Sequence, residues 1–306
     1  MITLFSIPRA FNGHIETIQR NAVTSWTLLE PRPEIILFGG DEGTKETAAE
    51  FRLRHVPQVA CNDYGTPLLS DLFGKAQELA TYDILGYVNA DIILMSDFMD
   101  AIRRVSRPKR RFLVVGQRWE IEINNPLDFR SGWEEGLRSL VAGKGKLQSQ
   151  AAMDYFIFPR GMWGEIPPFA IGRTIWDNWL CYRARALSVP VIDATESVMI
   201  VHQNHDYAHL PRGKIDAWEG PEAQRNSQLA GGWAHVFTLQ DASHKLPPNG
   251  RPRLILEQSY VKRHLETIPM LYPYAAQPVR LLRAFIRLSR PARMAVRRYL
   301  SSRRSI

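Results

Sequence analysis

Short apolar runs alternate with helix-forming patterns along the first 116 residues, and this alternation restricts the fold more than any other feature of the chain. The apolar runs predict buried strands, and the segments between them repeat apolar residues at steps of three and four. Strands and helices in alternation form a mainly parallel sheet with helices on both faces. We therefore predict an α/β fold whose ligands bind beyond the carboxyl ends of the strands. The expected strands are residues 2–6, 34–38, 58–61, 83–88 and 112–116.

Helical patterns fill the intervals between these strands, and the second half of the chain is less regular. Glycines and lysines between residues 119 and 150 predict a mobile segment, whose part around 130–150 we expect to close over a bound ligand. The expected helices are residues 12–29, 44–55 and 70–80, one that begins at Ser96, and 173–186. Later strands are expected at 154–158, 189–192 and 197–201, and residues 212–250 are polar and Gly-rich without a clear period.

The formal net charge of +8 comes from the C-terminal tail, residues 280–306, which holds nine arginines and no Asp, Glu or Lys. Without these nine, 30 basic residues face 31 acidic ones, so the rest of the chain is close to neutral. This distribution argues against a general nucleic-acid binder, and we expect no specific nucleic acid as a partner. The tail arginines are interleaved with Leu, Phe and Ile, which is typical of a basic amphipathic helix on an anionic membrane. A solvated tail that binds polyanions nonspecifically is the alternative.

Cysteine use and the ends of the chain indicate a compartment. Cys61 and Cys181 lie far apart and show no zinc or disulfide spacing, which favours a reducing environment. The N-terminus MITLFSIPR lacks a basic region and is expected to be a core strand rather than a signal peptide. The sequence shows no apolar stretch long enough to predict a membrane-spanning helix. We therefore expect a cytoplasmic protein, with the tail as a peripheral contact at the inner face of the plasma membrane.

The segment Val88-Asn89-Ala90-Asp91 ends the strand expected at 83–88. Residues at i and i+2 of an extended chain point the same way, so Asn89 and Asp91 can face one ion together. Oxygen ligands of this kind suit Mn²⁺ or Mg²⁺, which often bridge substrate phosphates. A strand end with Asx-turn chemistry is the alternative, but the position at the carboxyl end of a parallel strand favours the metal.

A second polar cluster, HQNHDYAH, follows the strand expected at 197–201 and holds His202, His205 and His209. Three histidines within eight residues make this loop a candidate for metal ligation, because imidazole is the commonest metal-binding side chain. A solvated polar loop is the alternative. A zinc hydrolase is disfavoured, because the histidines lack the helical spacing and the glutamate of metalloproteases.

A third candidate is Asp177, which lies between Trp176 and Trp179 in the helix expected at 173–186. Large aromatic neighbours remove water from a carboxylate, which raises its pKa and makes it a better general base. The alternative is that both tryptophans fill the core and that Asp177 caps the helix or forms an ion pair.

Taken together and in this order, the motifs VNADIIL, DYFIFPRG, GRTIWDNWL and HQNHDY make the chain resemble nucleotide-diphospho-sugar glycosyltransferases of the GT-A fold. The resemblance covers about residues 1–245, which would be the catalytic domain, followed by a linker or packing extension at 246–279 and the tail at 280–306. It implies a nucleotide-sugar donor, usually a uridine one, with Mn²⁺ or Mg²⁺ as cofactor. It also implies a glycan or glycolipid acceptor and a role in cell-surface polysaccharide or glycolipid synthesis.

The resemblance assigns roles to individual residues. Asp91 matches the metal-binding D-x-D motif, in which Asn89 stands for the first aspartate and so brings one fewer negative charge. His202 fits the late metal ligand, with His205 as second choice, and Asp177 matches the base that deprotonates the acceptor in inverting members. Residues matched to nucleotide binding are Ser6, Pro8 and Arg9 after the first strand, Gly40 and Asp41 after the second, Lys75 on a helix, and Asn89.

These matches predict that a metal bridges the donor diphosphate while Asp177 accepts the proton of the acceptor hydroxyl. Two other classes of protein compete with this interpretation. A sugar nucleotidyltransferase needs a Gly-rich loop for a triphosphate, and residues 6–13 hold a single Gly, which disfavours it. A sugar-nucleotide-binding protein with weak or no catalysis is kept open by Asn89.

Overall fold

The computed structural model describes residues 1–106, 111–205, 213–272, 274 and 277. The chain forms two compact units, Met1–Ile255 and Leu256–Ile306, and the second contains α9 (Gln258–Leu271). The tail at 280–306, for which a membrane-bound helix is predicted, lies outside the described residues, as does His209. None of the described helices is both long and apolar enough to span a bilayer.

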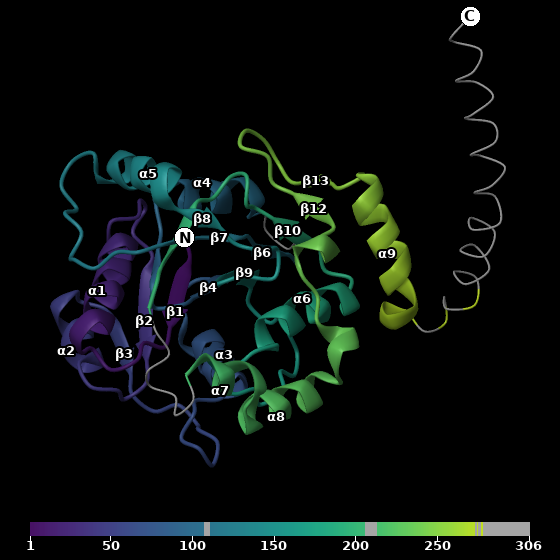
Figure 1. The fold of residues 1–306 in the computed structure, drawn as a ribbon, viewed down its shortest axis with the longest axis horizontal. Coiled ribbons are helices and arrows are strands. Elements are labelled where there is room, and N and C mark those ends of the chain that lie inside the picture. Colours follow the sequence, from purple (N-terminus) through teal and green to yellow (C-terminus); the bar gives the residue numbers. More distant parts are fainter. Residues whose placement is uncertain (107–110, 206–212, 273, 275–276, 278–306) are drawn as a thin grey trace, which may run out of the picture. The chain divides into compact units, whose positions relative to one another are not determined.

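The larger sheet of the first unit has nine strands in the order β13-β12-β10-β6-β9-β4-β1-β2-β3 (Figure 1). Strands β1 to β4 pair in parallel, as do β6, β10 and β12, whereas β9 runs antiparallel to both its neighbours, β4 and β6. The strands are β1 (Thr3–Ser6), β2 (Glu34–Phe38), β3 (Arg54–Val56), β4 (Ile84–Val88), β6 (Leu113–Val115), β9 (Tyr155–Pro159), β10 (Val191–Asp193), β12 (His244–Lys245) and β13 (Arg253–Leu254). The predicted mainly parallel α/β sheet is therefore confirmed.

Helices cover both faces of this sheet. Successive side chains of a strand point to opposite faces, so neighbouring residues of one strand contact helices on opposite sides. Leu4 of β1 belongs to a core cluster with Trp26 and Phe98, which come from α1 and α4. Its neighbour Phe5 packs edge-on against Phe73 of α3, with ring centroids 5.1 Å apart. The helices of the first unit are α1 (Gly13–Thr27), α2 (Thr44–Glu50), α3 (Leu69–Leu79), α4 (Ser96–Val105), α5 (Trp133–Lys144), α6 (Trp176–Ala186), α7 (Lys214–Glu219) and α8 (Pro221–Ala230), with 3₁₀ turns at Trp233–His235 and Leu239–Asp241.

A second, four-stranded sheet was not foreseen from the sequence. Its order is β5-β11-β7-β8, where the strands are β5 (Ile92–Ile93), β7 (Arg118–Ile121), β8 (Lys146–Leu147) and β11 (Ile200–Gln203). Helix α5 packs on this sheet, since Leu137 and Val141 share a buried cluster with Ile93 and Ile121. The chain thus leaves the large sheet at the end of β4 and enters the second sheet at β5 within four residues.

Two predicted segments differ from the structure. The third strand lies at Arg54–Val56 and not at 58–61, because α2 ends at Glu50 and Arg52 takes a left-handed φ of 55°, which turns the chain back early. Pro57 then ends the strand, since proline cannot donate to the sheet. The segment 119–150 is not a loop but holds most of β7, then α5 and β8.

The prediction of a loop at 119–150 gave too much weight to its glycines. Two of them, Gly132 and Gly145, bound α5 at its two ends, where glycine is favoured. The apolar residues inside α5 repeat at four-residue spacing and carry the packing described above. The spacing of the apolar residues, and not the glycine content, therefore determines that this segment forms a helix.

We predict that Trp26→Phe lowers the free energy of unfolding by about 1–3 kcal/mol, because it removes a buried hydrogen bond. The Trp26 indole is fully buried, and its Nε1 donates to the carbonyl of Ile92 in β5 over 2.8 Å. Urea unfolding measures the change, and Tyr64→Phe is the control, since the Tyr64 side chain is 67% exposed. Equal stability of the two variants would show that α1 does not secure β5 in this way.

Candidate metal centre

The backbone pairing of β5 with β11 positions the centre. The two strands run antiparallel, with His202 opposite Ile92 and Val201 opposite Ile93. Asp91 directly precedes β5, so it faces the end of β11 and the residues that follow. His202 therefore lies inside a strand and His205 lies beyond its end, whereas the sequence suggested that the whole histidine cluster formed a loop.

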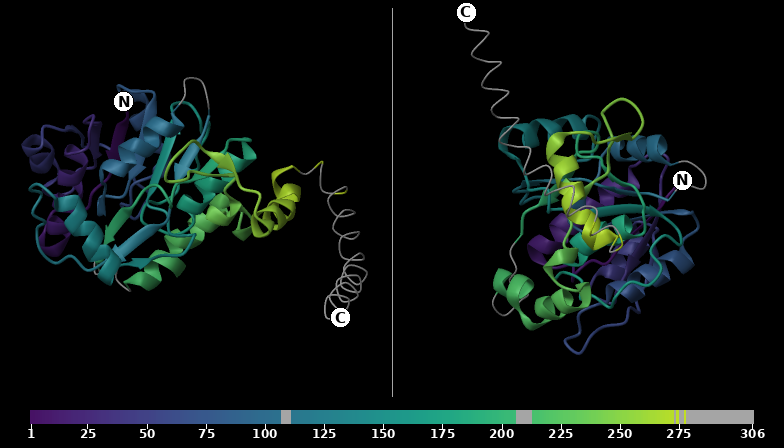
Figure 2. Two further views of the ribbon diagram at one scale, coloured as in Figure 1. Left: turned by 90° about the horizontal axis from the view of Figure 1, so that it is seen from above. Right: turned by 90° about the vertical axis from the view of Figure 1, so that its right-hand side faces the viewer.

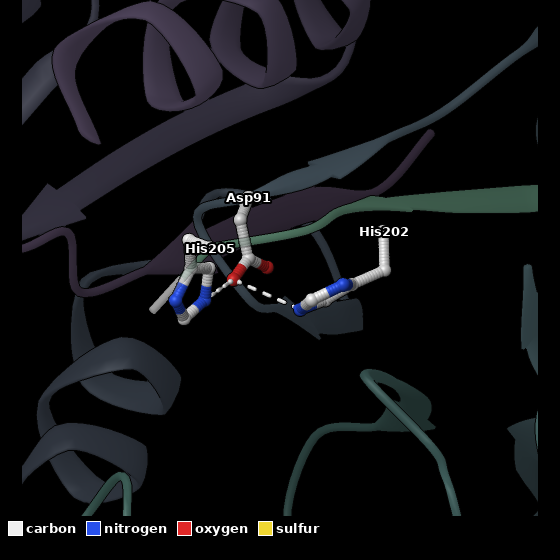
Figure 3. Close-up of side chains that lie close together, drawn as sticks. All are labelled: Asp91, His202 and His205. Carbon is white, nitrogen blue, oxygen red and sulfur yellow. Dashed lines mark hydrogen bonds and ion pairs between the residues drawn. The ribbon is translucent and has the colours of Figure 1, made fainter. Parts of the chain in front are cut away.

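Asp91, His202 and His205 form one cluster, in which the Asp91 carboxylate lies between the two imidazole rings (Figure 3). Its Oδ2 is 3.4 Å from His202 Nε2 and 3.0 Å from His205 Nε2. One ligand atom from each of the three residues lies within 4.8 Å of the other two. The three metal ligands predicted from the sequence are thus brought together.

Gln203 holds this cluster in place and was missed by the sequence analysis. It is fully buried, and its side-chain Nε2 donates to the backbone carbonyls of Asp91 and Ile18, over 3.0 and 2.8 Å. Its Oε1 accepts from Asn21 Nδ2 of α1 over 2.9 Å. A polar residue inside an apolar strand was the available signal, since a buried amide requires partners on both of its ends.

The charges inside the cluster depend on one another. Burial would raise the pKa of Asp91, but the two neighbouring histidines hold it well below its usual value. Burial would lower the pKa of His202, but the Asp91 carboxylate raises it above its usual value. Opposite charges at this distance stabilise each other, so the negative charge of Asp91 is retained in a nearly closed site.

The cluster fits a divalent cation. Asp91 Oδ1 is buried and has no hydrogen-bond partner among the described residues, so one carboxylate oxygen remains to be satisfied. One carboxylate and two imidazoles form a donor set that suits Mn²⁺, Zn²⁺ or Fe²⁺ better than Mg²⁺, which prefers oxygen ligands.

Asn89 is held by an acidic neighbour that the sequence analysis did not single out. Its side-chain amide donates to Asp154 Oδ1 over 2.7 Å, and its backbone N–H donates to the Asp154 carbonyl over 3.0 Å. Arg118 donates to both Asp154 oxygens, over 3.0 and 2.8 Å, and also to Glu120. Asp154 opens the motif DYFIFPRG, and its position directly before a strand was the signal that could have identified it.

Asp177 lies in the first turn of α6, and its Oδ1 accepts from the backbone N–H of Asn178 over 2.9 Å. Burial and the charge of Asp154 together raise the pKa of Asp177 to about 7, although backbone hydrogen bonds and Arg118 oppose the rise. The residue before the helix, Ile175, has a φ of 88°, which is strained for a β-branched side chain. Strain of this kind persists where the surrounding packing enforces it, often beside functional groups.

The charges of three carboxylates act on one buried phenol, that of Tyr87. Burial raises the pKa of Tyr87, and the nearby negative charges of Asp91, Asp154 and Asp177 add to the rise. The ring of Tyr87 also packs edge-on against Trp176, with centroids 5.4 Å apart. The charge of Asp154 also acts on both His202 and Asp177, which links the metal cluster electrostatically to the start of α6.

Of the residues matched to nucleotide binding, Arg9 is joined to the cluster. Its guanidinium Nη2 lies 3.3 Å from His205 Nδ1. Ser6 and Pro8 are buried, and the Ser6 hydroxyl donates to the carbonyl of Val88 over 2.6 Å. Ser6 thus ties the end of β1 to the end of β4, close to Asn89.

Gly40 and Asp41 line an open cavity of about 480 Å³ at the carboxyl end of β2, together with Phe11, Glu42, Gly43, Lys45, Glu46 and His55. Lys75 is engaged elsewhere, because its ammonium donates to Asp71 over 2.8 Å and to the carbonyl of Gln58 over 2.9 Å. The structure therefore brings Arg9 to the metal cluster, places Gly40 and Asp41 at a separate cavity and ties Lys75 to α3 and the segment before it.

No protein-family model and no curated protein matches this chain. The chain is similar to glucosyl-3-phosphoglycerate synthase from Mycobacterium tuberculosis, solved with Mg²⁺ and UDP, with 14% identity over 76% of this chain and 80% of that one and a TM-score of 0.43. It is also similar to the mannosyltransferase PcManGT from Pyrobaculum calidifontis, solved with GDP-Man and Mn²⁺, with 12% identity over 66% of this chain and 56% of that one and a TM-score of 0.41. TarS from S. aureus, residues 1–349, is 11% identical over 66% of this chain and 60% of that one, with a TM-score of 0.42. Similarity of this degree assigns no activity to the chain.

We predict that Asp91→Ala weakens Mn²⁺ binding by at least about 100-fold, because it removes the only anionic ligand of the cluster. Calorimetric titration of the full chain with MnCl₂ measures this, and MgCl₂ should bind the unchanged protein more weakly than MnCl₂. Asp83→Ala is the control, since Asp83 directly precedes β4, the strand before Asp91, and its side chain is 95% exposed. Undiminished Mn²⁺ binding by the Asp91 variant would remove this residue from the ligand set.

Proposed function

We propose that the chain is a metal-dependent glycosyltransferase of the GT-A type, which moves a sugar from a UDP-sugar to an acceptor hydroxyl. One observation carries the proposal: the chain combines a cluster of one carboxylate and two histidines with Asp177, a buried carboxyl group whose pKa is raised to about 7, and the charge of Asp154 acts on both His202 and Asp177. The order of the four sequence motifs supports the same function.

The donor would bind across the carboxyl ends of β1, β2 and β4. The open cavity at Gly40 and Asp41 can receive the nucleoside, and Arg9 can pair with the diphosphate. Asp91, His202 and His205 would hold Mn²⁺, which when bound would neutralise charge on the diphosphate leaving group. We propose Mn²⁺ rather than Mg²⁺ because two of the three ligands are imidazoles.

Asp177 would act on the acceptor. A carboxyl group with a pKa of about 7 is largely ionised just above neutral pH and is a stronger base than an exposed aspartate. It would accept the proton of the acceptor hydroxyl while that oxygen attacks the anomeric carbon from the side opposite the diphosphate. This geometry gives inversion at the anomeric carbon.

A binding protein without catalysis is the second candidate, because Asn89 replaces the first aspartate of the metal motif. Asp154 weakens this alternative, since it places a carboxylate directly beside the Asn89 amide. Hydrolysis of a UDP-sugar in the presence of Mn²⁺ separates the two candidates, because a binding protein would return the donor intact.

We predict that Asp177→Asn lowers turnover by about 100-fold or more while the dissociation constant of the donor stays nearly the same. The amide fills the same space but cannot accept the proton. In the wild type, kcat/KM should rise as the pH passes the pKa of about 7, because the base must be ionised, and this rise should be absent in the variant. Asp83→Asn is the matched control. Turnover within a few-fold of the wild type would make Asp177 a structural residue and would remove the support for inversion.

We further propose that the acceptor is a glycan or glycolipid at the cytoplasmic face of the plasma membrane, and that the arginine-rich tail holds the protein there. Each arginine near an anionic surface contributes about 1 kcal/mol, which salt weakens. The full chain should therefore sediment with anionic vesicles and partly release in high salt, whereas a chain that ends at Tyr274 should not sediment. Equal sedimentation of both chains would contradict the anchor.

A further inference from the structure

Arg9 contacts the ring of His205 on the side away from Asp91. The backbone of Arg9 is held in place by Gln19, which accepts from its N–H and donates to its carbonyl, both over 2.8 Å. From this position its Nη2 lies 3.3 Å from His205 Nδ1, and the other ring nitrogen, Nε2, lies 3.0 Å from Asp91 Oδ2. His205 thus has a guanidinium on one nitrogen and a carboxylate on the other.

These two neighbours determine which ring nitrogen carries the hydrogen. A guanidinium has donors and no acceptor, so Nδ1 of His205 must accept the hydrogen bond from Arg9. A neutral imidazole carries one N–H, which then lies on Nε2 and donates to Asp91. The nitrogen that faces the cluster therefore presents a hydrogen and not a lone pair.

Ligation of a metal by His205 Nε2 requires the opposite arrangement. The hydrogen must lie on Nδ1, where it would point at the N–H groups of Arg9. Metal-bound histidines usually donate their outer N–H to an acceptor such as a carboxylate, a carbonyl or water. As long as Arg9 stays on His205, it opposes metal binding both through this contact between two donors and through its positive charge.

We propose that Arg9 is a positioning residue that makes metal binding depend on the donor diphosphate, because it must leave His205 before His205 can ligate the metal. The inference rests on the proposed function, which supplies the diphosphate. Arg9 exchanges a neutral imidazole for phosphate oxygens, which form charge-assisted and often bidentate bonds with a guanidinium. Nδ1 of His205 is then released and takes up a proton from water, while Nε2 gives its proton to water, so that Nε2 presents a lone pair to the cluster.

Coupling of this kind is reciprocal. UDP should strengthen Mn²⁺ binding by the same factor by which Mn²⁺ strengthens UDP binding, and such factors commonly lie between about 5 and 150. The metal would therefore be bound firmly only when the diphosphate is present.

The first test titrates the full chain with MnCl₂ in a calorimeter, without nucleotide and at saturating UDP, with binding of Mn²⁺ to UDP in solution measured separately. Arg9→Gln should bind Mn²⁺ alone roughly tenfold more tightly than the wild type, because the glutamine oxygen can accept from Nδ1 of His205. The strengthening by UDP should shrink in this variant. Arg9→Lys should remain within about threefold of the wild type without nucleotide, since lysine is also a cationic donor without an acceptor.

The second test observes the ring directly. With ¹⁵N-labelled histidine, NMR of the metal-free wild type should show the His205 hydrogen on Nε2, with His205→Asn used to assign the signals. Arg103→Gln is the matched control for loss of a positive charge, because the Arg103 side chain is 57% exposed and pairs with Asp100 on α4. It should change neither the ring signals nor Mn²⁺ affinity.

Three results would overturn the proposal: a wild-type ring with its hydrogen on Nδ1, equal Mn²⁺ affinity of Arg9→Gln and the wild type, or no effect of UDP on Mn²⁺ binding by the wild type. None of these measurements requires sugar transfer. If the coupling is found but no sugar is transferred, only the proposed function fails.

Discussion

The antiparallel pairing of β5 with β11 is the interaction on which the rest of the site depends. It is a short pairing, with His202 opposite Ile92 and Val201 opposite Ile93, and its position is secured from both sides. Trp26 of α1 donates to the carbonyl of Ile92, and Gln203 donates to the carbonyl of Asp91. A shift by one residue would turn every side chain of β11 to the other face and would separate the histidines from the aspartate.

Charge then divides the carboxylates of the site into two kinds. Asp91 and Asp154 each have a cationic or protonatable partner at hydrogen-bond distance, in the histidines and in Arg118. Asp177 has backbone N–H groups instead, and Asp154 adds a like charge, so burial dominates and its pKa rises. The same surroundings can therefore keep one carboxylate ionised as a metal ligand and another ready to exchange a proton near neutral pH.

The sequence was sufficient to predict the residues that the local pattern itself marks. Asp91 could be predicted because it follows a strand, and His202 and His205 because they belong to a dense run of histidines. Asp177 could be predicted because it lies in a Trp-rich helix. The roles of Asp154, Arg118 and Gln203 were not predicted, because they arise from contacts between strands far apart in the chain, such as β9 with β4 and β11 with β7. The local signals at Asp154 and Gln203 mark a polar residue at a strand but do not name its partners. The second sheet was missed for the same reason, since β5 and β8 are two residues long and carry no period of their own.

The residues of the site differ in how firmly their backbones are held. Asp91, His202 and Asp154 lie in strands or directly beside them, and strand pairing fixes their backbones. His205 lies two residues beyond β11, and Arg9 lies three residues beyond β1, so neither backbone is part of a ladder. Rearrangement of these two side chains breaks the contact between them and leaves the strand pairing intact. A ligand that needs the metal cluster in a different state would therefore act first on the contact between Arg9 and His205.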